Sequence, residues 1–200
     1  MPSSEVALAI AKDQLSRILY ATVATCSDDG QPWNSPVYSA YDEDLNIYWA
    51  SDVNAVHSQN IRANKRAFVV FYDSTVPEGT GQGLYFRCTA TELQDPSDMA
   101  KGCEVLSTRV GKANASPDGF MNKSSLRVYR AVPNEGWVND DELIANRQVD
   151  VRIRIDLAEL HSSPDKPLPA PTSSTARSVI SPPLALTCFS NVAARFLWDL

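Results

Sequence analysis

Short runs of β-branched and aromatic residues, each followed by turn-forming residues, constrain this 200-residue chain more than any other feature of its sequence. The run ATVATCS ends at DDGQP, and the apolar run AFVVFYD ends at STVPEGTGQG before LYFRCTATEL begins. Further along, VDVRIRIDL alternates apolar and charged residues, which is the pattern of a strand with one solvent-exposed face. About seven such segments at short spacing predict an antiparallel barrel in an α+β fold, and not a doubly wound sheet.

Three segments between the strands carry helical signals. Apolar residues recur at helical spacing from Val6 to Leu19, after serines that can cap a helix. NAVHSQNIRANKR predicts a short helix with Asn54 as its N-cap, and PSDMAKGCEVLSTRV predicts a helix with Pro96 near its start. Pro36, within WNSPVYSAYD, predicts an edge strand or a bulge, because proline cannot donate a hydrogen bond to a neighbouring strand.

The composition changes near His161. The last 39 residues contain 6 of the 13 prolines and none of the 8 glycines, and a periodic apolar pattern is missing from SSPDKPLPAPTSSTARSVISPP. We therefore expect a barrel domain over residues 1–160 and a Pro/Ser-rich, poorly ordered tail over residues 161–200. The alternative is that the final apolar segment of the tail docks onto a partner or clasps a dimer.

Charge and cysteine content restrict the possible partners. The formal net charge is −6 and the pI is near 4.9, and no basic stripe is visible, so we expect no nucleic-acid binding. The four cysteines form no C-x-x-C pair and only two histidines accompany them, so we expect no metal site. The sequence has neither an apolar run of membrane-spanning length nor a signal-peptide core, which predicts a cytoplasmic protein without a membrane partner. We expect the acidic run at 42–44 to form a solvated turn.

The strand-to-helix turn YWASDVNAVHSQNI is a candidate anion site. Unpaired N–H groups at the start of a helix attract anions, and His57 and Ser58 add two side-chain donors for a phosphate. Ser35 beside Pro36 leaves irregular backbone groups at a strand edge, and the glycines around Gln82 allow close approach of the backbone to a flat ligand. The alternatives are purely structural: an exposed helix residue, a proline-marked edge strand and a flexible glycine loop.

Taken in order, TVATCSDDGQPWNSPVYSAYDEDLNIYWASDVNAVHSQNIRANKRAFVVFYDS and GQGLYFRCTATEL resemble the pyridoxamine 5′-phosphate oxidase-like family of FMN-binding split barrels. The resemblance rests on the G-x-P-x-x-S-P-V hairpin, the W-x-S-D turn and the H-S-x-N-I helix start. These motifs lie between Ala21 and Leu93, with a weaker echo in SLRVYRAVPNEGWVND. The resemblance implies an α+β, mainly β fold: a six- to seven-stranded antiparallel split β-barrel with flanking helices.

The resemblance also implies a homodimer that binds FMN at the subunit interface. The positions that correspond to cofactor contacts are Ser35, Pro36 and Val37 at the isoalloxazine edge, Ser51 and Asp52 beside the ribityl chain and phosphate, His57 and Ser58 at the phosphate, and Gln82 near the flavin. A deazaflavin or a haem in place of FMN is the alternative cofactor.

One departure from the family pattern concerns the phosphate. Where pyridoxamine phosphate oxidases tend to show S-R-K, this chain has Ala55, Val56 and His57, so an apolar residue and an imidazole replace a pair of cations. The C-terminal substrate motif of the true oxidases is also not visible. We therefore expect an FMN-dependent oxidoreductase acting on a small molecule that the sequence does not identify, with no assigned general acid or base. The alternatives are a non-catalytic flavin, deazaflavin or haem binding protein of the same fold, and an interaction protein that has lost its cofactor.

Overall fold

A computed structural model describes residues 4–111, 124–144 and 147–161 of the chain. The tail predicted over residues 161–200 lies outside this part except for His161. The described helices are α1 (Ser4–Arg17), α2 (Val56–Asn64), α3 (Pro96–Arg109) and α4 (Leu157–His161). The strands are β1 (Tyr20–Cys26), β2 (Pro32–Tyr38), β3 (Ala40–Tyr41), β4 (Ile47–Asp52), β5 (Arg66–Tyr72), β6 (Gly83–Glu92), β7 (Leu126–Ile144) and β8 (Arg147–Ile155). None of these helices has the length and apolar character needed to cross a bilayer.

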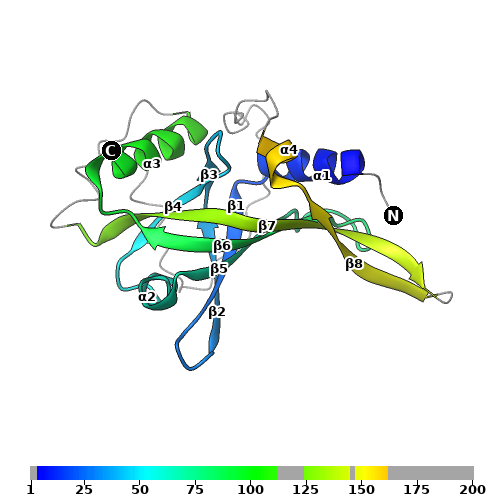
Figure 1. Cartoon of the computed structure of the whole chain (residues 1–200), viewed down its shortest axis with the longest axis horizontal. Helices are drawn as coiled ribbons and strands as arrows, with labels where there is room; N and C mark the ends of the chain where they lie inside the picture. The colour runs from blue at the N-terminus through cyan, green and yellow to red at the C-terminus, as the bar shows by residue number, and fades with distance from the viewer. Residues whose placement is uncertain (1–3, 112–123, 145–146, 162–200) are drawn as a thin grey trace, which may run out of the picture.

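The strands form one antiparallel sheet in the order β2-β1-β5-β6-β7-β4-β3, with β8 added to β7. The sheet curls until β2, at one end of this order, contacts β4 near the other end, which gives the expected split barrel. The described sheet has eight strands and not six or seven, because the two-residue β3 counts as a strand of its own. Figure 1 shows α1 and α4 side by side at one end of the sheet and α3 at the other.

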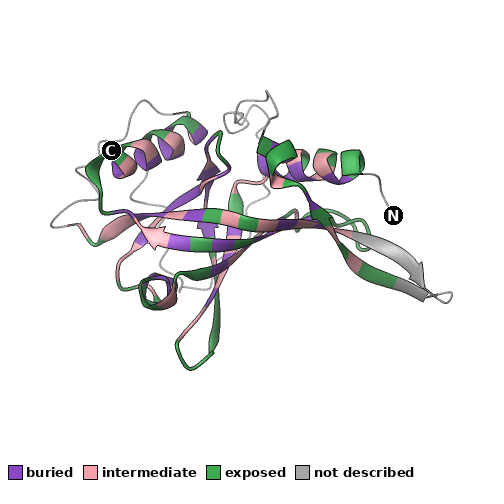
Figure 2. Cartoon of the chain, in the orientation of Figure 1, coloured by how far each residue is buried: buried purple, intermediate pink, exposed green. Residues whose placement is uncertain are grey.

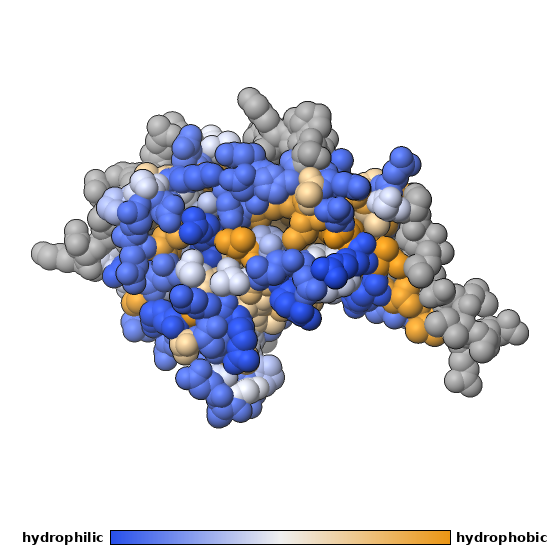
Figure 3. Space-filling model, in the orientation of Figure 1, coloured by the Kyte–Doolittle hydropathy of each residue, from blue (hydrophilic) through white to orange (hydrophobic). Residues whose placement is uncertain are grey.

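Strand β7 connects β6 to β4 within the sheet and also pairs with β8. LRVYRAV and GWVND belong to one strand of 19 residues. Its first residues pair with β4, its middle pairs with β6, and the residues from Gly136 onward pair with β8. Beyond the body of the barrel, β7 and β8 continue as a projecting hairpin, with apolar side chains along its base (Figure 3).

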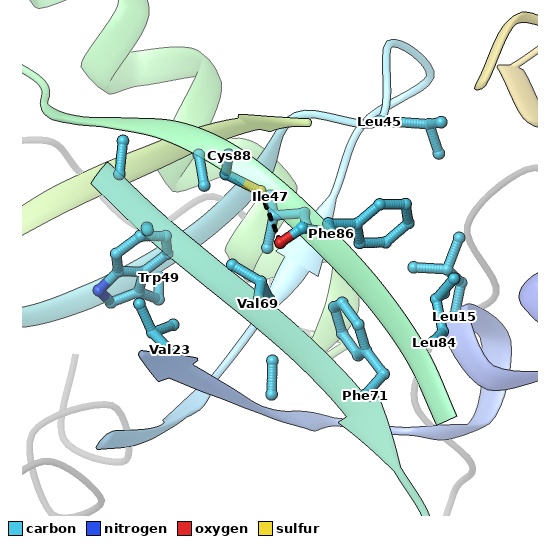
Figure 4. Close-up of a cluster of buried hydrophobic side chains, with 14 of the residues drawn as sticks. Leu15, Val23, Leu45, Ile47, Trp49, Val69, Phe71, Leu84, Phe86 and Cys88 are labelled. Carbon is cyan, nitrogen blue, oxygen red and sulfur yellow. Dashed lines mark hydrogen bonds between the residues drawn. The ribbon is translucent and has the colours of Figure 1, made fainter. Parts of the chain in front are cut away.

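The core lies inside the curl of the sheet. Strands β1 and β5 alternate between buried and half-buried residues, as expected for strands with one face inward (Figure 2). Large side chains from four strands and α1 meet there (Figure 4), among them Leu15, Val23, Trp49, Val69, Phe71, Leu84 and Phe86. Burial of this apolar surface is the main contribution to the stability of such a fold.

The opposite, outer face of the sheet carries three aromatic side chains in mutual contact. The rings of Phe68 and Trp137 stack with their centroids 6.2 Å apart, and Tyr85 lies 6.4 Å from Phe68. The guanidinium of Arg87 lies 5.6 Å from the Trp137 ring, and that of Arg152 lies 4.2 Å from the Tyr85 ring. We call Phe68, Tyr85 and Trp137 the outer aromatic patch; its three side chains are only half-buried.

The expectation of a solvated turn at 42–44 is wrong for Asp42. Its side chain is fully buried and accepts hydrogen bonds from Asn46 and from the Tyr48 hydroxyl, both at 3.0 Å, while Lys101 of α3 lies 3.0 Å away. Burial alone would raise the pKa of Asp42, but hydrogen bonds from Asn46, Lys101 and Tyr48 outweigh it and hold the pKa below its usual value. Asp42 therefore fastens the β3–β4 turn to α3.

Candidate cofactor site at the junction of β2, β4 and α2

Strands β2 and β4 contact each other where the sheet closes, and α2 contacts β2 beside them. On β4, Trp49 and Ser51 lie on one face because side chains alternate along a strand. Trp49 is fully buried and its ring stacks on Tyr129 of β7, with a centroid distance of 5.7 Å. Ser51, only 8% exposed, is the next residue on that face toward the end of the strand. The junction thus combines the apolar Trp49–Tyr129 stack with a polar residue, Ser51, at the end of the strand.

His57 is turned into this junction and is only 6% exposed. A hydrogen bond of 2.9 Å joins its Nε2 to Ser51 Oγ, and its ring approaches that of Tyr129 edge-on. Burial lowers the pKa of His57 below its ordinary value of 6.5. The imidazole is therefore neutral near pH 7, and the pairing of His57 with Ser51 brings together two of the residues predicted from the sequence.

The start of α2 differs from the sequence prediction in its capping. Ala55, not Asn54, is the N-cap, and no side chain makes a capping hydrogen bond there. Asn54 instead donates its backbone N–H to the Asp52 carboxylate at 2.7 Å, so that Asp52 organises the turn. Ser58 is fully buried and donates its hydroxyl proton to the Asp52 carbonyl at 2.8 Å.

A charged cluster closes the same end of the barrel. Glu92 of β6 accepts hydrogen bonds from the Tyr129 hydroxyl at 3.2 Å and from Arg62 of α2 at 3.0 Å. Arg127 of β7 lies on its other side, with Nε 3.7 Å from Glu92. In the β4–β7 pairing, Arg127 stands directly opposite Ser51. The sheet therefore places a guanidinium beside the Ser51–His57 pair.

Strand β2 forms the edge of the sheet, as Pro36 predicts. Ser35 Oγ accepts a hydrogen bond from the indole of Trp33 at 3.1 Å, and Val37 is buried in the core. Pro36 pairs with Thr22 of β1 and is exposed; because strand side chains alternate, it lies on the opposite face from Ser35 and Val37. Two of the three predicted β2 residues thus share the face that leads to the core.

Gln82 lies outside the three elements that form this junction. It is exposed and precedes Gly83, which pairs with Tyr72 at the end of β6 remote from Glu92. At about 3.3 Å per residue, the ten residues of β6 separate the two ends of the strand by roughly 30 Å.

Two residues of the junction are missing from the sequence prediction. The indole N–H of Trp49 is fully buried and lacks a hydrogen-bond partner, and in Figure 4 its nitrogen points away from the side chains of Ile47 and Val69. Arg127 reaches Ser51 only through the pairing of β4 with β7. The W-x-S spacing in β4 signals that Trp49 and Ser51 share a face, but no local pattern signals a contact between strands so far apart in sequence.

The family model for pyridoxamine 5′-phosphate oxidase matches residues 9–139, which is more than half of the chain. Among curated proteins, none matches the chain.

Solved structures show the same fold at low sequence identity. A protein of unknown function from Agrobacterium tumefaciens is 19% identical, with a TM-score of 0.57; the match covers 75% of this chain and 63% of that protein. A haem binding protein from Mycobacterium smegmatis is 15% identical, with a TM-score of 0.54, covering 80% of this chain and 60% of that protein. A haem storage protein from Vibrio cholerae is 17% identical, with a TM-score of 0.51, covering 62% and 87%. This chain thus spans less than two thirds of the first two proteins.

Proposed function

Because this chain belongs to the pyridoxamine 5′-phosphate oxidase family, we propose that it binds FMN at the junction of β2, β4 and α2 and acts as an FMN-dependent oxidoreductase on a small molecule. The observation that supports the proposal is that β2 contacts both β4 and α2 where the barrel closes, since these elements carry Ser35, Ser51 and His57. These are positions that family resemblance associates with the cofactor.

The residues of the junction suit the aromatic part of a flavin. The buried Trp49 N–H has no partner, and an orphaned donor of this kind is stabilised by any acceptor that reaches it. Ser35 and Val37 offer a hydroxyl and an apolar side chain from an edge strand, whose unpaired backbone groups can meet the polar edge of a flat ring. Pro36, on the other face, acts by keeping this strand at the edge.

The start of α2 suits a phosphate through its backbone more than through its side chains. Since no side chain caps the helix, the N–H groups of its first turn and the positive end of its dipole favour an anion there. The side chains of His57 and Ser58 are already hydrogen-bonded to Ser51 and to the Asp52 carbonyl. We propose that both residues shape the turn that receives the phosphate, together with Ser51 and Asp52.

A flavin supplies hydride chemistry when it is bound, and the protein supplies position and hydrogen bonds. Here the buried Trp49–Tyr129 stack fixes β4 against β7, and the Ser51–His57 hydrogen bond fixes α2 against β4. We assign no general acid or base to any of these residues. The free thiols of Cys26, Cys88 and Cys103 support a reducing compartment, and we propose the cytoplasm.

The second candidate is a non-catalytic carrier of a flavin, a deazaflavin or a haem. The observation that favours it is the first turn of α2, which carries no acidic residue, no lysine and no arginine, and in which the imidazole of His57 is neutral. A site with little positive charge binds a cofactor that lacks a phosphate more readily than it binds FMN.

A homodimer completes the proposal. We propose that Gln82, which is exposed and precedes β6, meets the cofactor from a second copy of the chain. The outer aromatic patch gives such a copy an apolar surface to cover.

The visible spectrum of the purified protein tests the proposal. We expect bound flavin or, for protein isolated without cofactor, quenching of tryptophan fluorescence on titration with FMN, because Trp33 and Trp49 lie at the junction. Reduction of the bound FMN by a nicotinamide donor, with reoxidation by an added acceptor, supports the oxidoreductase. A Soret band after titration with haem, without any response to FMN, supports the carrier. A colourless protein that binds neither contradicts both.

A further inference from the structure

We infer that Arg127 supplies the positive charge for the phosphate of the proposed cofactor and so makes the site select a phosphorylated flavin over riboflavin. This inference rests on the proposed function, and it assigns to a strand residue the part that family resemblance gives to a helix residue.

The need for such a residue follows from the start of α2. The first turn of this helix contains no lysine or arginine, and the arginine of the helix, Arg62, stands in its last turn. His57 is buried against Tyr129 and its Nε2 is hydrogen-bonded to Ser51. A phosphate is dianionic near neutral pH, and its strong contacts are with charged donors. Some other cation has to approach the turn if the phosphate is to be recognised.

Arg127 is placed for this by the sheet. It stands directly opposite Ser51 in the β4–β7 pairing, so both side chains lie on the face that carries Trp49 and Tyr129. Its Nη1 donates to the carbonyl oxygens of Ser124 and Leu126, at 2.6 and 2.7 Å. Its side chain is 23% exposed. These backbone contacts hold the guanidinium in place while leaving part of it accessible, and its fork of donors matches a phosphate.

The two carboxylates near Arg127, those of Glu92 and Asp52, accept hydrogen bonds from other residues. One oxygen of Glu92 already accepts hydrogen bonds from Arg62 and Tyr129, and the other remains 3.7 Å from Arg127 Nε, longer than a hydrogen bond. The pKa of Asp52 is held below its usual value first by the backbone N–H of Asn54, then by the Ser125 side chain, and only lastly by Arg127. Neither carboxylate depends on Arg127 alone for its stabilisation.

The neighbouring cations are placed less well. Arg62 is 3.0 Å from Glu92 and stands in the last turn of α2, away from the helix start. Arg130, three residues further along β7, lies 3.4 Å from Asp98 of α3, which packs on the opposite face of β4 and β7. Arg130 is therefore a matched control: it has the same side chain on the same strand, with an ion pair of its own, and it lies on the opposite face of the sheet from Trp49 and Ser51.

Binding of FMN and of riboflavin to the wild-type protein, Arg127→Gln and Arg130→Gln tests the inference, because the two ligands differ only by the phosphate. We expect the wild type to bind FMN more tightly than riboflavin. Arg127→Gln should lose about ten- to 150-fold in affinity for FMN, the loss of one hydrogen bond to a charged group, and bind riboflavin as the wild type does. Arg127→Lys should retain part of the preference, since it keeps the charge without the fork.

The outcomes separate this inference from the proposed function. A wild-type protein that binds neither ligand contradicts the proposed function itself. A wild type that binds both equally, or an Arg127→Gln variant that keeps the full preference for FMN, leaves the flavin site standing and overturns the role of Arg127. If Arg127→Gln loses both ligands and melts at a lower temperature, Arg127 is structural and the inference is wrong. Arg130→Gln should preserve the preference; its loss there also contradicts the inference.

Discussion

At the scale of single residues, burial decides what a polar side chain can do. His57 and Ser58 stand at a helix start, and their types alone suggest two donors for an anion. In the folded chain both are buried and hydrogen-bonded to neighbours, so their contribution is to hold the turn in shape. Asp42 makes the same point: its place in an acidic run suggests a solvated carboxylate, yet Asn46, Tyr48 and Lys101 enclose it.

The buried imidazole predicts that acid destabilises the protein through His57. Its pKa is lowered in the folded state below the ordinary 6.5, so the unfolded chain binds the proton more readily. The stability is complete above the unfolded pKa and is lost as the pH falls below it, by up to about 1.4 kcal/mol per pH unit. His57→Gln removes this titration, and thermal melts at about pH 7.5 and 5.5 should show a smaller loss of stability on acidification than in the wild type.

The second histidine serves as the control for this measurement. His161 is exposed at the end of α4, so His161→Gln makes the same change of side chain outside the core. If His57→Gln and the wild type lose equal stability between the two pH values, another group carries the acid sensitivity.

At the scale of elements, local patterns predict most of this fold and fail where distant segments meet. The alternation of β1 and β5, the edge position that Pro36 gives β2, and the Pro96 start of α3 are all present in the structure. β7 continues through Pro133 and Gly136, two residues that weaken a local strand pattern. Only pairing with β6 on one side and with β4 and β8 on the other makes one strand of it.

The same distinction applies to the candidate site. The sequence alone identifies Ser35, Ser51 and His57 as candidates, since each lies in a motif of a few residues. The contact between Ser51 and Arg127 depends on strand pairing over more than 70 residues, which no local spacing encodes. The N-cap of α2 was predicted wrongly because the Asp52 carboxylate takes the backbone N–H of Asn54 and shifts the helix start by one residue.

Gly136 offers a test of how tightly the elements pack. It lies between Phe86 of β6 and Ile155 of β8, and an added Cβ would come within 3.0 Å of atoms of both and of Leu157 in α4. Since three neighbours must give way together, Gly136→Ala should lower the free energy of unfolding by about 1–3 kcal/mol. Chemical denaturation measures this.

The matched substitution for that experiment is Gly81→Ala. A Cβ at Gly81 meets nothing closer than Val76 Cγ2 at 3.9 Å, so the expected change in unfolding free energy is close to zero. Equal stabilities for Gly136→Ala and Gly81→Ala would show that the packing of β6, β7, β8 and α4 is looser than the structure has it.

At the scale of the whole molecule, the distribution of apolar surface supports association with a second copy. The outer aromatic patch lies on the face of the sheet opposite the core, and Tyr72, 48% exposed, lies in the same row of β5 as Phe68. Grouped apolar residues of this kind on a sheet face are typical of surfaces that become covered.

We predict a homodimer at tens of micromolar protein in sedimentation experiments. Tyr72→Arg places a charge at the edge of the patch without disturbing the core, and it should shift the protein toward monomer because burying an unpaired charge is costly. Ala100→Arg, on the exposed side of α3, adds the same side chain elsewhere and should leave the dimer intact. A monomeric wild type, or dissociation by Ala100→Arg alone, contradicts this arrangement.

The length of β7 also sets the order in which the molecule can form. β4 has its partner on β7, with Ile47 paired to Ala131, so 84 residues (131 − 47) separate two segments that must meet. The β1–β2 hairpin closes locally, whereas β4 pairs locally only with the two-residue β3 and otherwise needs a strand far along the chain, and such non-local pairing is slow. In pulsed hydrogen exchange during refolding, the β4 amides should gain protection together with those of β7 and after those of β1. The site proposed for the cofactor, between β2, β4 and α2, is therefore complete only once β7 has formed.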